Sequence, residues 1–131
     1  MIYPITKEPE IGLFTVVARI NDNQRIKLII DTGATVTTID SNVLYMFGYR
    51  PSDAIGTEAV ETASGIIETS LYELSEFHLF GITKSKFVIQ AHDFLEHGII
   101  SDYNGLLGID FFESYKFCID TETNELTIIK K

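Results

Sequence analysis

An acidic residue at the end of an apolar strand is the feature that most constrains this chain. Residues 28–30 (Leu-Ile-Ile) lead directly into Asp31, which is followed by Thr32, Gly33 and Ala34. Burying a carboxylate costs several kcal/mol unless it is paired or hydrogen-bonded, and carboxyl groups in such surroundings are common at functional sites. Asp31 is therefore the leading candidate functional residue. The alternative is an ordinary turn, in which Asp31 caps backbone N–H groups and Gly33 adopts a positive φ.

Two segments downstream of Asp31 favour the functional interpretation. Residues 104–112 (Asn-Gly-Leu-Leu-Gly-Ile-Asp-Phe-Phe) form a second apolar run that a glycine interrupts. Residues 61–67 (Glu-Thr-Ala-Ser-Gly-Ile-Ile) lie between this run and Asp31, and their composition is typical of a hairpin tip. Each segment is a weak signal, whereas the three in this order are a strong one.

Together the three segments resemble the retropepsin-like aspartic proteases, over roughly residues 13–129. In that family a hydrophobic-hydrophobic-Asp-Thr-Gly-Ala loop is followed by a glycine-bearing flap hairpin, and then by a hydrophobic-hydrophobic-Gly segment before a short helix. The resemblance implies an all-β fold, a small closed barrel with one or two short helices, and no cofactor or catalytic metal. It implies three groups of site residues: Asp31 as the catalytic acid; Thr32, Gly33, Ala34, Leu106, Leu107 and Gly108 as support for the active site; and Thr62, Ala63, Ser64, Gly65 and Ile66 as a substrate-binding flap.

The single Asp-Thr-Gly motif predicts a homodimer. Hydrolysis of an amide needs one group to activate water and another to protonate the leaving nitrogen, and two carboxyl groups that share one proton can do both. Because the chain has one such motif, the second Asp31 has to come from another copy related by a two-fold axis. The resemblance implies that Thr32 hydrogen-bonds across this axis and that Gly33 lets the backbone approach the carboxylates.

Length and composition fit a single domain over residues 1–131. No apolar stretch approaches the ~18 residues that would span a bilayer, so no membrane association is predicted. The net charge of −9 and the scattered basic residues argue against nucleic acid as a partner. Residues 1–5 do not have the pattern of a signal peptide, and one cysteine cannot form an internal disulfide, so a cytoplasmic location is predicted. The expected partners are a second copy and a peptide or protein substrate.

Short strands account for most of the chain, with a little helix. A first helix is predicted over residues 43–47, with Asp40 or Ser41 as the N-cap and Gly48 at its end. A second short helix is predicted from Gly108 through Tyr115. Residues 91–103 read as an irregular polar segment. The strands are predicted over residues 13–20, 25–30, 35–39, 57–80 with a turn at 63–65, 86–90 after a turn at 81–84, 116–120 and 125–129.

His92, His97 and Cys118 are three residues with potential chemistry of their own. The two histidines are five residues apart, which places them on neither the same helical face nor the same strand face, so they are interpreted as residues of a solvated loop. A zinc site that adds a nearby aspartate is the alternative. Cys118 lies in an apolar run without a neighbouring histidine, and we interpret it as a small core residue.

Ala34 bears on the pH dependence of activity. A serine or threonine at this position could donate a hydrogen bond to the catalytic carboxylate and stabilise its ionised form, whereas alanine cannot. We therefore predict an activity optimum at mildly acidic to neutral pH.

Both chain ends are strand-like, over residues 1–5 and 126–129. In retropepsins the chain ends commonly contribute to a sheet at the dimer interface, so the resemblance implies that role here. A loose N-terminal arm is the alternative, because Pro4 interrupts the N-terminal segment.

Two other functions fit parts of the pattern. The same fold could serve as a non-catalytic dimerisation or peptide-binding module, although the intact Asp31-Thr32-Gly33 favours the enzyme. Asp-x-Gly turns also occur in the phosphate-binding loops of sugar kinases and actin-like ATPases. That fold needs a much longer chain and a second phosphate loop, and no second loop is visible in the sequence.

Overall fold

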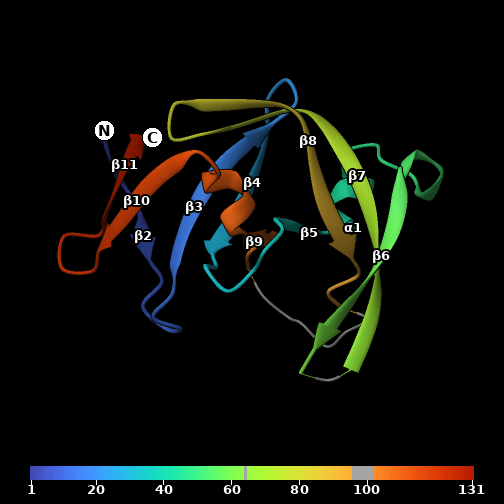
Figure 1. The fold of residues 1–131 in the computed structure, drawn as a ribbon. Helices are drawn as coiled ribbons and strands as arrows, with labels where there is room; N and C mark the ends of the chain where they lie inside the picture. The colour runs from blue at the N-terminus through green and yellow to red at the C-terminus, as the bar shows by residue number, and fades with distance from the viewer. Residues whose placement is uncertain (64, 96–101) are drawn as a thin grey trace.

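The computed structural model describes residues 1–63, 65–95 and 102–131. Most of these residues lie in strands, with one short α-helix and two 3-10 turns among them. The predicted all-β class is therefore confirmed (Figure 1). None of the described helices has the length and apolar character needed to cross a bilayer.

The larger sheet is wound into a ring. Its strands lie in the order β2-β3-β4-β9-β5-β8-β7-β6, and an additional pairing of β3 with β7 closes the ring. Strand β9 is inserted between β4, to which it is parallel, and β5, to which it is antiparallel. The chain therefore brings its second apolar run beside the strand that precedes Asp31. The bounds are β2 (Thr6–Lys7), β3 (Phe14–Ile20), β4 (Gln24–Ile30), β5 (Thr38–Asp40), β6 (Gly56–Thr62), β7 (Gly65–Leu79), β8 (Ile82–His92) and β9 (Gly105–Leu107).

A smaller sheet joins the two ends of the chain. Strands β1 (Ile2–Pro4), β10 (Tyr115–Asp120) and β11 (Glu125–Lys130) lie in the order β1-β11-β10. The N–H of Ile128 donates to the carbonyl of Met1 at 2.9 Å, and Figure 1 shows the two termini next to each other. The N-terminal segment is thus a strand, β1, that pairs with β11 of the same chain, and the alternative of a loose arm is wrong.

The core is built from alternating side chains of the strands and from two short helical segments. Alternate residues of β3 point inward, so that Ala18 and Ile20 are fully buried. Helix α1 (Ser41–Met46) begins as predicted at Asp40, whose Oδ1 accepts a hydrogen bond from the N–H of Asn42. Gly48, with a φ of +97°, follows its last turn. The 3-10 turns are η1 (Pro51–Asp53) and η2 (Ile109–Phe112), and η2 buries Phe111 and Phe112.

Two predicted elements next to Asp31 are shorter than expected. The strand predicted over residues 35–39 is formed only by β5, because the N–H of Thr37 bonds to a carboxylate instead of a neighbouring strand. The helix predicted over residues 108–115 is limited to η2. It ends before Ser114, whose φ of +71° turns the chain into β10.

The connection between β7 and β8 is tighter than the predicted turn over residues 81–84. Phe80 and Gly81 have φ values of +53° and +69°, and Ile82 already belongs to β8. Such a two-residue connection with positive φ at both positions matches the right-handed twist of an antiparallel pair. Strand β8 is correspondingly longer than predicted at both ends and includes His92.

Two interpretations of single residues are wrong. Cys118 is exposed rather than a core residue, because Phe117 and Ile119 point from β10 toward the core and Cys118 therefore lies on the other face. His92 is the half-buried last residue of β8 and not part of a solvated loop. His97 lies outside the described residues.

Candidate active site

Asp31 directly follows β4 and is held by backbone hydrogen bonds on both sides. Its N–H donates to the carbonyl of Leu107 at 3.0 Å, and its carbonyl accepts from the N–H of Ala34 at 3.1 Å. The carboxylate Oδ1 accepts a hydrogen bond from the N–H of Gly33 at 3.0 Å. Backbone and carboxylate are therefore both fixed by the same turn, while the side chain remains partly exposed.

Gly33 is favoured for its small size rather than for its backbone dihedrals. A Cβ at this position would lie 3.3 Å from Oδ1 of Asp31, and the φ of Gly33 is not in the left-handed region. The ordinary-turn alternative is therefore correct that Asp31 accepts a backbone N–H and wrong about the positive φ. Thr32, the residue between them, is exposed.

The second apolar run packs against the back of the Asp31 loop. Leu107 is fully buried, Leu106 faces the cavity described below, and the N–H of Ile109 donates to the carbonyl of Ala34 at 2.9 Å. A Cβ on Gly108 would lie 2.7 Å from the carbonyl carbon of Val36, so only glycine allows this approach of two backbones. The two segments thus form one closely packed unit.

A partly buried polar network, which the sequence did not predict, joins the same two segments. The N–H of Thr37 donates to both carboxylate oxygens of Asp110 at 3.0 Å, and its hydroxyl donates to Oδ1 at 2.8 Å. The hydroxyl oxygen of Thr37 accepts the N–H of Gly108 at 3.1 Å. Asp110 also accepts the N–H of Phe111. The available signal was an acid in the first turn of a short helix, where unpaired backbone N–H groups attract a carboxylate.

Asp31 lines a cavity of about 540 Å³ that it shares with the β6–β7 hairpin. The loop that carries Asp31 and strand β9 form the base of this cavity, and the hairpin forms the facing wall. Of the residues predicted as a flap, Thr62 lines this cavity with Asp31, whereas Ala63, Gly65 and Ile66 do not. Its lining includes Asp31, Ala34 and Leu106 from the base, Val60 and Thr62 from the hairpin, and His92 from β8.

The described residues of the hairpin tip are joined by the end of the β6–β7 ladder. Thr62 pairs with Gly65, and the Thr62 hydroxyl donates to the Gly65 carbonyl at 2.7 Å. Gly65 has a φ of +123°, which few other residues adopt, and Ile66 is 75 % exposed. Ala63 is also exposed, and Ser64 lies outside the described residues. Figure 1 shows the tip reaching away from the ring.

His92 shares the cavity, and its ring packs against Phe94 with a centroid distance of 4.9 Å. Within residues 1–63, 65–95 and 102–131, no group of three or more His, Cys, Asp and Glu side chains is placed to hold a metal ion. His97, the second residue of the zinc alternative, is not among these residues.

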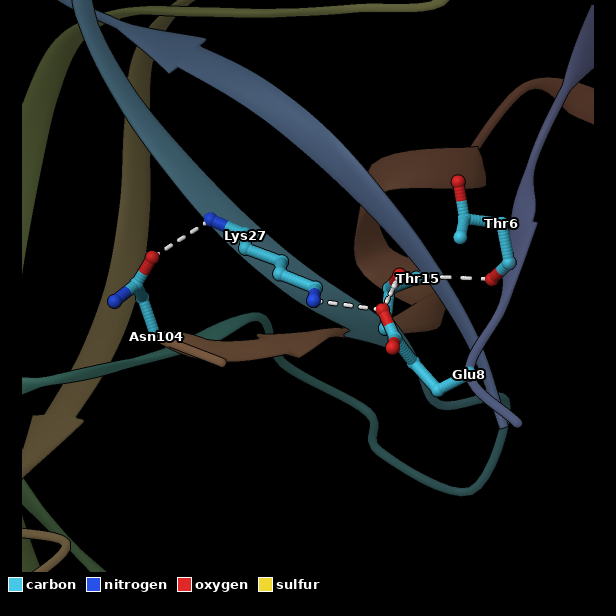
Figure 2. Close-up of polar contacts among 5 residues, drawn as sticks. All are labelled: Thr6, Glu8, Thr15, Lys27 and Asn104. Carbon is cyan, nitrogen blue, oxygen red and sulfur yellow. Dashed lines mark hydrogen bonds and ion pairs between the residues drawn. The ribbon is translucent and has the colours of Figure 1, made fainter. Parts of the chain in front are cut away.

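A second polar cluster surrounds Lys27, which lies on β4 four residues before Asp31 (Figure 2). Lys27 Nζ contacts Glu8 Oε1 at 2.6 Å, and the hydroxyl of Thr15 donates to the same oxygen at 2.9 Å. These hydrogen bonds, first from Lys27 and then from Thr15, hold the pKa of the Glu8 carboxyl below its ordinary value. Lys27 N–H also donates to the side chain of Asn104 at 2.7 Å, which continues the pairing of β4 with β9.

The cluster borders a cavity of about 610 Å³ that is larger than the one at Asp31 but contains no residue of the Asp-Thr-Gly motif. It is lined by Glu8, Thr15 and Lys27 of the cluster and by Glu10, Ile11, Leu13, Asp102 and Tyr103. We regard the smaller cavity as the candidate site, because it holds the carboxylate that the fold positions.

Comparisons with known proteins agree with this geometry. A family model described as aspartyl protease matches residues 16–111, which include Asp31, the hairpin and Gly108. A sequence search of curated proteins found no match. Among solved structures, a retropepsin-like aspartic protease from Rickettsia conorii superposes with a TM-score of 0.68 at 19% identity, covering 98% of this chain and 89% of that one. The EIAV protease in complex with the inhibitor HBY-793 gives 0.61 at 18% identity, covering 82% and 92%. At 19% and 18% sequence identity, these two superpositions show a similarity of fold alone.

Proposed function

Because this chain belongs to the retropepsin-like aspartic proteases, we propose that it is an aspartic endopeptidase that acts as a homodimer, with one Asp31 from each copy in the catalytic pair. The observation that carries this proposal is the position of Asp31, which is fixed by backbone bonds at the base of a cavity and faced by a hairpin. One chain supplies one such carboxylate, so the site is complete only in a dimer.

In the proposed mechanism the two carboxyl groups hold one proton between them, because like charges about 3 Å apart cannot both be present. The ionised Asp31 takes a proton from a bound water molecule, which attacks the peptide carbonyl carbon. The protonated Asp31 of the partner donates its proton to the carbonyl oxygen, which gives a tetrahedral diol. The first Asp31, which now holds the proton from the water, passes it to the leaving nitrogen as the C–N bond breaks, and the partner's carboxylate takes a proton from a diol hydroxyl, so that the pair again holds one proton. Thr32 and Gly33 would orient the pair from either side of the two-fold axis.

The substrate in this proposal is an extended peptide segment. Extended peptides bind by adding a strand, with backbone hydrogen bonds for affinity and pockets for alternate side chains. The hairpin from Thr62 to Ile66 would close over the peptide and exclude water. We further propose that residues 1–131 act as one domain and that the protein is cytoplasmic, which is supported by its single cysteine.

Cleavage of a peptide library tests the proposal. The wild-type protein should cleave it, a pepstatin-like inhibitor should block cleavage, and Asp31→Asn should lower the rate by about 10³-fold or more. Asp22→Asn, on an exposed turn, is the matched control and should retain the rate. Cleavage that persists in Asp31→Asn would exclude the proposed chemistry. A wild-type dimer that binds peptides without cleaving them would support the non-catalytic module instead.

A further inference from the structure

Four neighbouring strands of the larger sheet each place a polar side chain toward the cavity at the candidate active site. The register pairs Thr38 of β5 with Gln90 of β8, and Glu58 of β6 with Thr69 of β7. Gln90 also lies opposite Leu71, which is two residues from Thr69 on β7. Paired residues share one face of a sheet, as do residues two apart on a strand. The four polar residues therefore form one polar row across β5, β8, β7 and β6.

The buried members of the polar row direct their hydrogen bonds toward Glu58. Thr69 and Gln90 are 1% and 7% exposed, and a buried polar group is costly unless it is hydrogen-bonded. The hydroxyl of Thr69 donates to the carbonyl oxygen of Glu58 at 3.0 Å, and Nε2 of Gln90 donates to Oε2 of Glu58 at 3.4 Å. Backbone and carboxylate of Glu58 are thus both held by side chains of neighbouring strands.

The Glu58 carboxylate keeps one oxygen for a bound molecule. Glu58 is exposed, although Thr38, Thr69 and Gln90 of the same row are buried. Within the part of the chain that the structure describes, its carboxylate forms one hydrogen bond, the one from Gln90, and no ion pair. An ionised carboxylate accepts hydrogen bonds at both oxygens, so Oε1 can accept one from a donor in the cavity.

The charged side chains around the cavity are of one sign. Asp31, Glu58 and Glu61 contribute carboxylates, and none of the described residues that line the cavity is a lysine or an arginine. Glu61 is three residues from Glu58, so its side chain leaves the other face of β6 and does not belong to the polar row. A cleft lined by negative charge concentrates positively charged groups. The cavity therefore favours a cation, and Glu58 is the acid that the polar row orients.

Apolar side chains lie next to Glu58 on the same wall. Val60 and Ile67 are a cross-strand pair of β6 and β7, both are half-buried, and both line the cavity. They follow the Glu58–Thr69 pair on the same face, toward the hairpin tip. Lysine and arginine bury an aliphatic stem along apolar surface and keep a charged end in polar surroundings. The wall offers both surfaces side by side.

We propose that this cavity selects a lysine or arginine side chain of the peptide substrate, and that Glu58 is the residue that recognises the cation. The inference rests on the proposed function, because the peptide is the substrate of the Asp31 pair, and it names the class of peptide. The aliphatic stem packs on Val60 and Ile67, and the ammonium or guanidinium group donates to Oε1 of Glu58. Gln90 positions the carboxylate without touching the peptide.

Two-fold symmetry sets where the basic residues lie in the peptide. Each copy of the proposed dimer contributes one Asp31 and one Glu58 wall, so the complete site has two such cavities. The axis passes between the two Asp31 residues, and one cavity therefore lies on either side of the bond that is cleaved. The preference for a basic residue should appear at two positions, about equally far from that bond.

A peptide series tests the preference. Each position of a neutral peptide that the wild type cleaves is replaced in turn by lysine, by glutamate or by norleucine, which has an aliphatic stem like that of lysine but no ammonium group. At one position on each side of the cleaved bond, kcat/KM should be about 5-fold higher for lysine than for norleucine, and lowest for glutamate. The difference should shrink as salt is added. Equal rates for lysine and norleucine at every position would overturn the proposal.

Substitutions of Glu58 separate recognition from a structural role. Glu58→Gln should bring the lysine-to-norleucine ratio of kcat/KM close to 1, and Glu58→Lys should reverse the order of the lysine and glutamate peptides. A structural role would lower all rates together and leave the ratio unchanged. Glu68→Gln is the matched control, because it removes the same charge at an exposed position of β7 that does not line the cavity. A wild-type ratio in Glu58→Gln, or an equal loss of the ratio in Glu68→Gln, would contradict recognition by Glu58.

Binding to Asp31→Asn makes this inference separable from the proposed function. The labelled peptides are titrated with this variant, which keeps Glu58, and fluorescence anisotropy gives their dissociation constants. Tighter binding of the lysine peptides, without cleavage of any peptide by the wild type, would keep the selective cavity and remove the protease. Cleavage without a lysine preference would keep the protease and remove the selectivity. Lysine and norleucine peptides that bind equally and are cleaved equally, or not at all, would overturn the inference.

Discussion

The two walls of the Asp31 cavity are built in opposite ways. The base is fixed by contacts between segments far apart in sequence, through the Asp31–Leu107 backbone bond and the partly buried Thr37–Asp110 network. The facing hairpin is fixed mainly by its own β6–β7 ladder, and its tip is exposed at Ile66. The base therefore fixes Asp31 in one position, and we expect the exposed tip to deform more easily than the base.

Substitutions in the two walls should therefore differ in their effects on stability and activity. A change in the base should reduce stability and activity together, because the same contacts hold the core and the carboxylate. A change at the tip should reduce activity with little effect on stability.

Gly108→Ala should have the largest effect. Its Cβ would lie 2.7 Å from a backbone atom of Val36 and 2.9 Å from the carbonyl oxygen of Ala34, neither of which can rotate away. We expect unfolding to become easier by about 3 kcal/mol, measured by urea denaturation, with cleavage lost in parallel.

The control for this prediction is Gly56→Ala. The added Cβ would meet only Cδ1 of Leu71, at an ordinary 3.8 Å, and the glycine does not have a positive φ. The unfolding free energy should change by less than about 0.5 kcal/mol. An equal loss in the two variants would mean that the base is not specially constrained.

Thr37→Val should have the next largest effect. Valine keeps the shape of the buried side chain but removes the hydroxyl that donates to Asp110 and accepts from Gly108. We expect a loss of about 1–3 kcal/mol and a lower kcat. A double-mutant cycle with Asp110→Asn should show strong coupling, whereas Thr57→Val, at an exposed position of β6, should be neutral. Additive effects of the two changes would contradict a shared network.

The secondary-structure elements that could be predicted are those determined by residues adjacent in sequence. Runs of β-branched and apolar residues bounded by turn residues predicted β3, the hairpin of β10 and β11, and the hairpin of β6 and β7. The position of Asp31 after a buried strand followed from three apolar residues and one acid. Helix α1 was predictable because its cap, Asp40, is adjacent to it in sequence.

What could not be predicted depends on contacts between distant residues. Thr37 and Asp110 are 73 residues apart, and neither side chain looks unusual in its own segment. Their bond explains why β5 begins late and places η2 behind the Asp31 loop. Cys118 was misassigned for a related reason: an apolar run in an edge strand has one exposed face, and the sequence does not say which strand lies at the edge.

Ile66→Ser tests the hairpin side of the comparison. The side chain is 75 % exposed, so its loss should change the melting temperature by no more than about 2 °C. We expect kcat/KM to fall about 10-fold, because an apolar group that would close over the peptide is lost. A large loss of stability without a loss of kcat/KM would reverse the roles of the two walls.

Ala34→Ser tests whether residue 34 influences the pH dependence of the cleavage rate. A serine hydroxyl would stabilise an ionised carboxylate at Asp31, so the acidic limb of the pH–rate profile should move to lower pH by about 1 unit. The wild-type optimum should lie at mildly acidic to neutral pH. A wild-type profile that peaks below about pH 3 would contradict the role of Ala34.

Glu8→Gln should have the smallest effect, because the Glu8–Lys27 pair lies at the surface and lines neither wall of the Asp31 cavity. Hydrogen bonds from Lys27 and Thr15 lower the pKa of Glu8 from 4.5 in the folded protein, so the carboxylate contributes stability above this value and loses it as pH falls through the lowered pKa. The wild type should therefore melt higher than Glu8→Gln at pH 7, by no more than about 2 °C, and the difference should disappear in acid. Thermal melts across this pH range measure it. If the difference instead grew as the pH fell, the pair would not be acting through the ionised carboxylate.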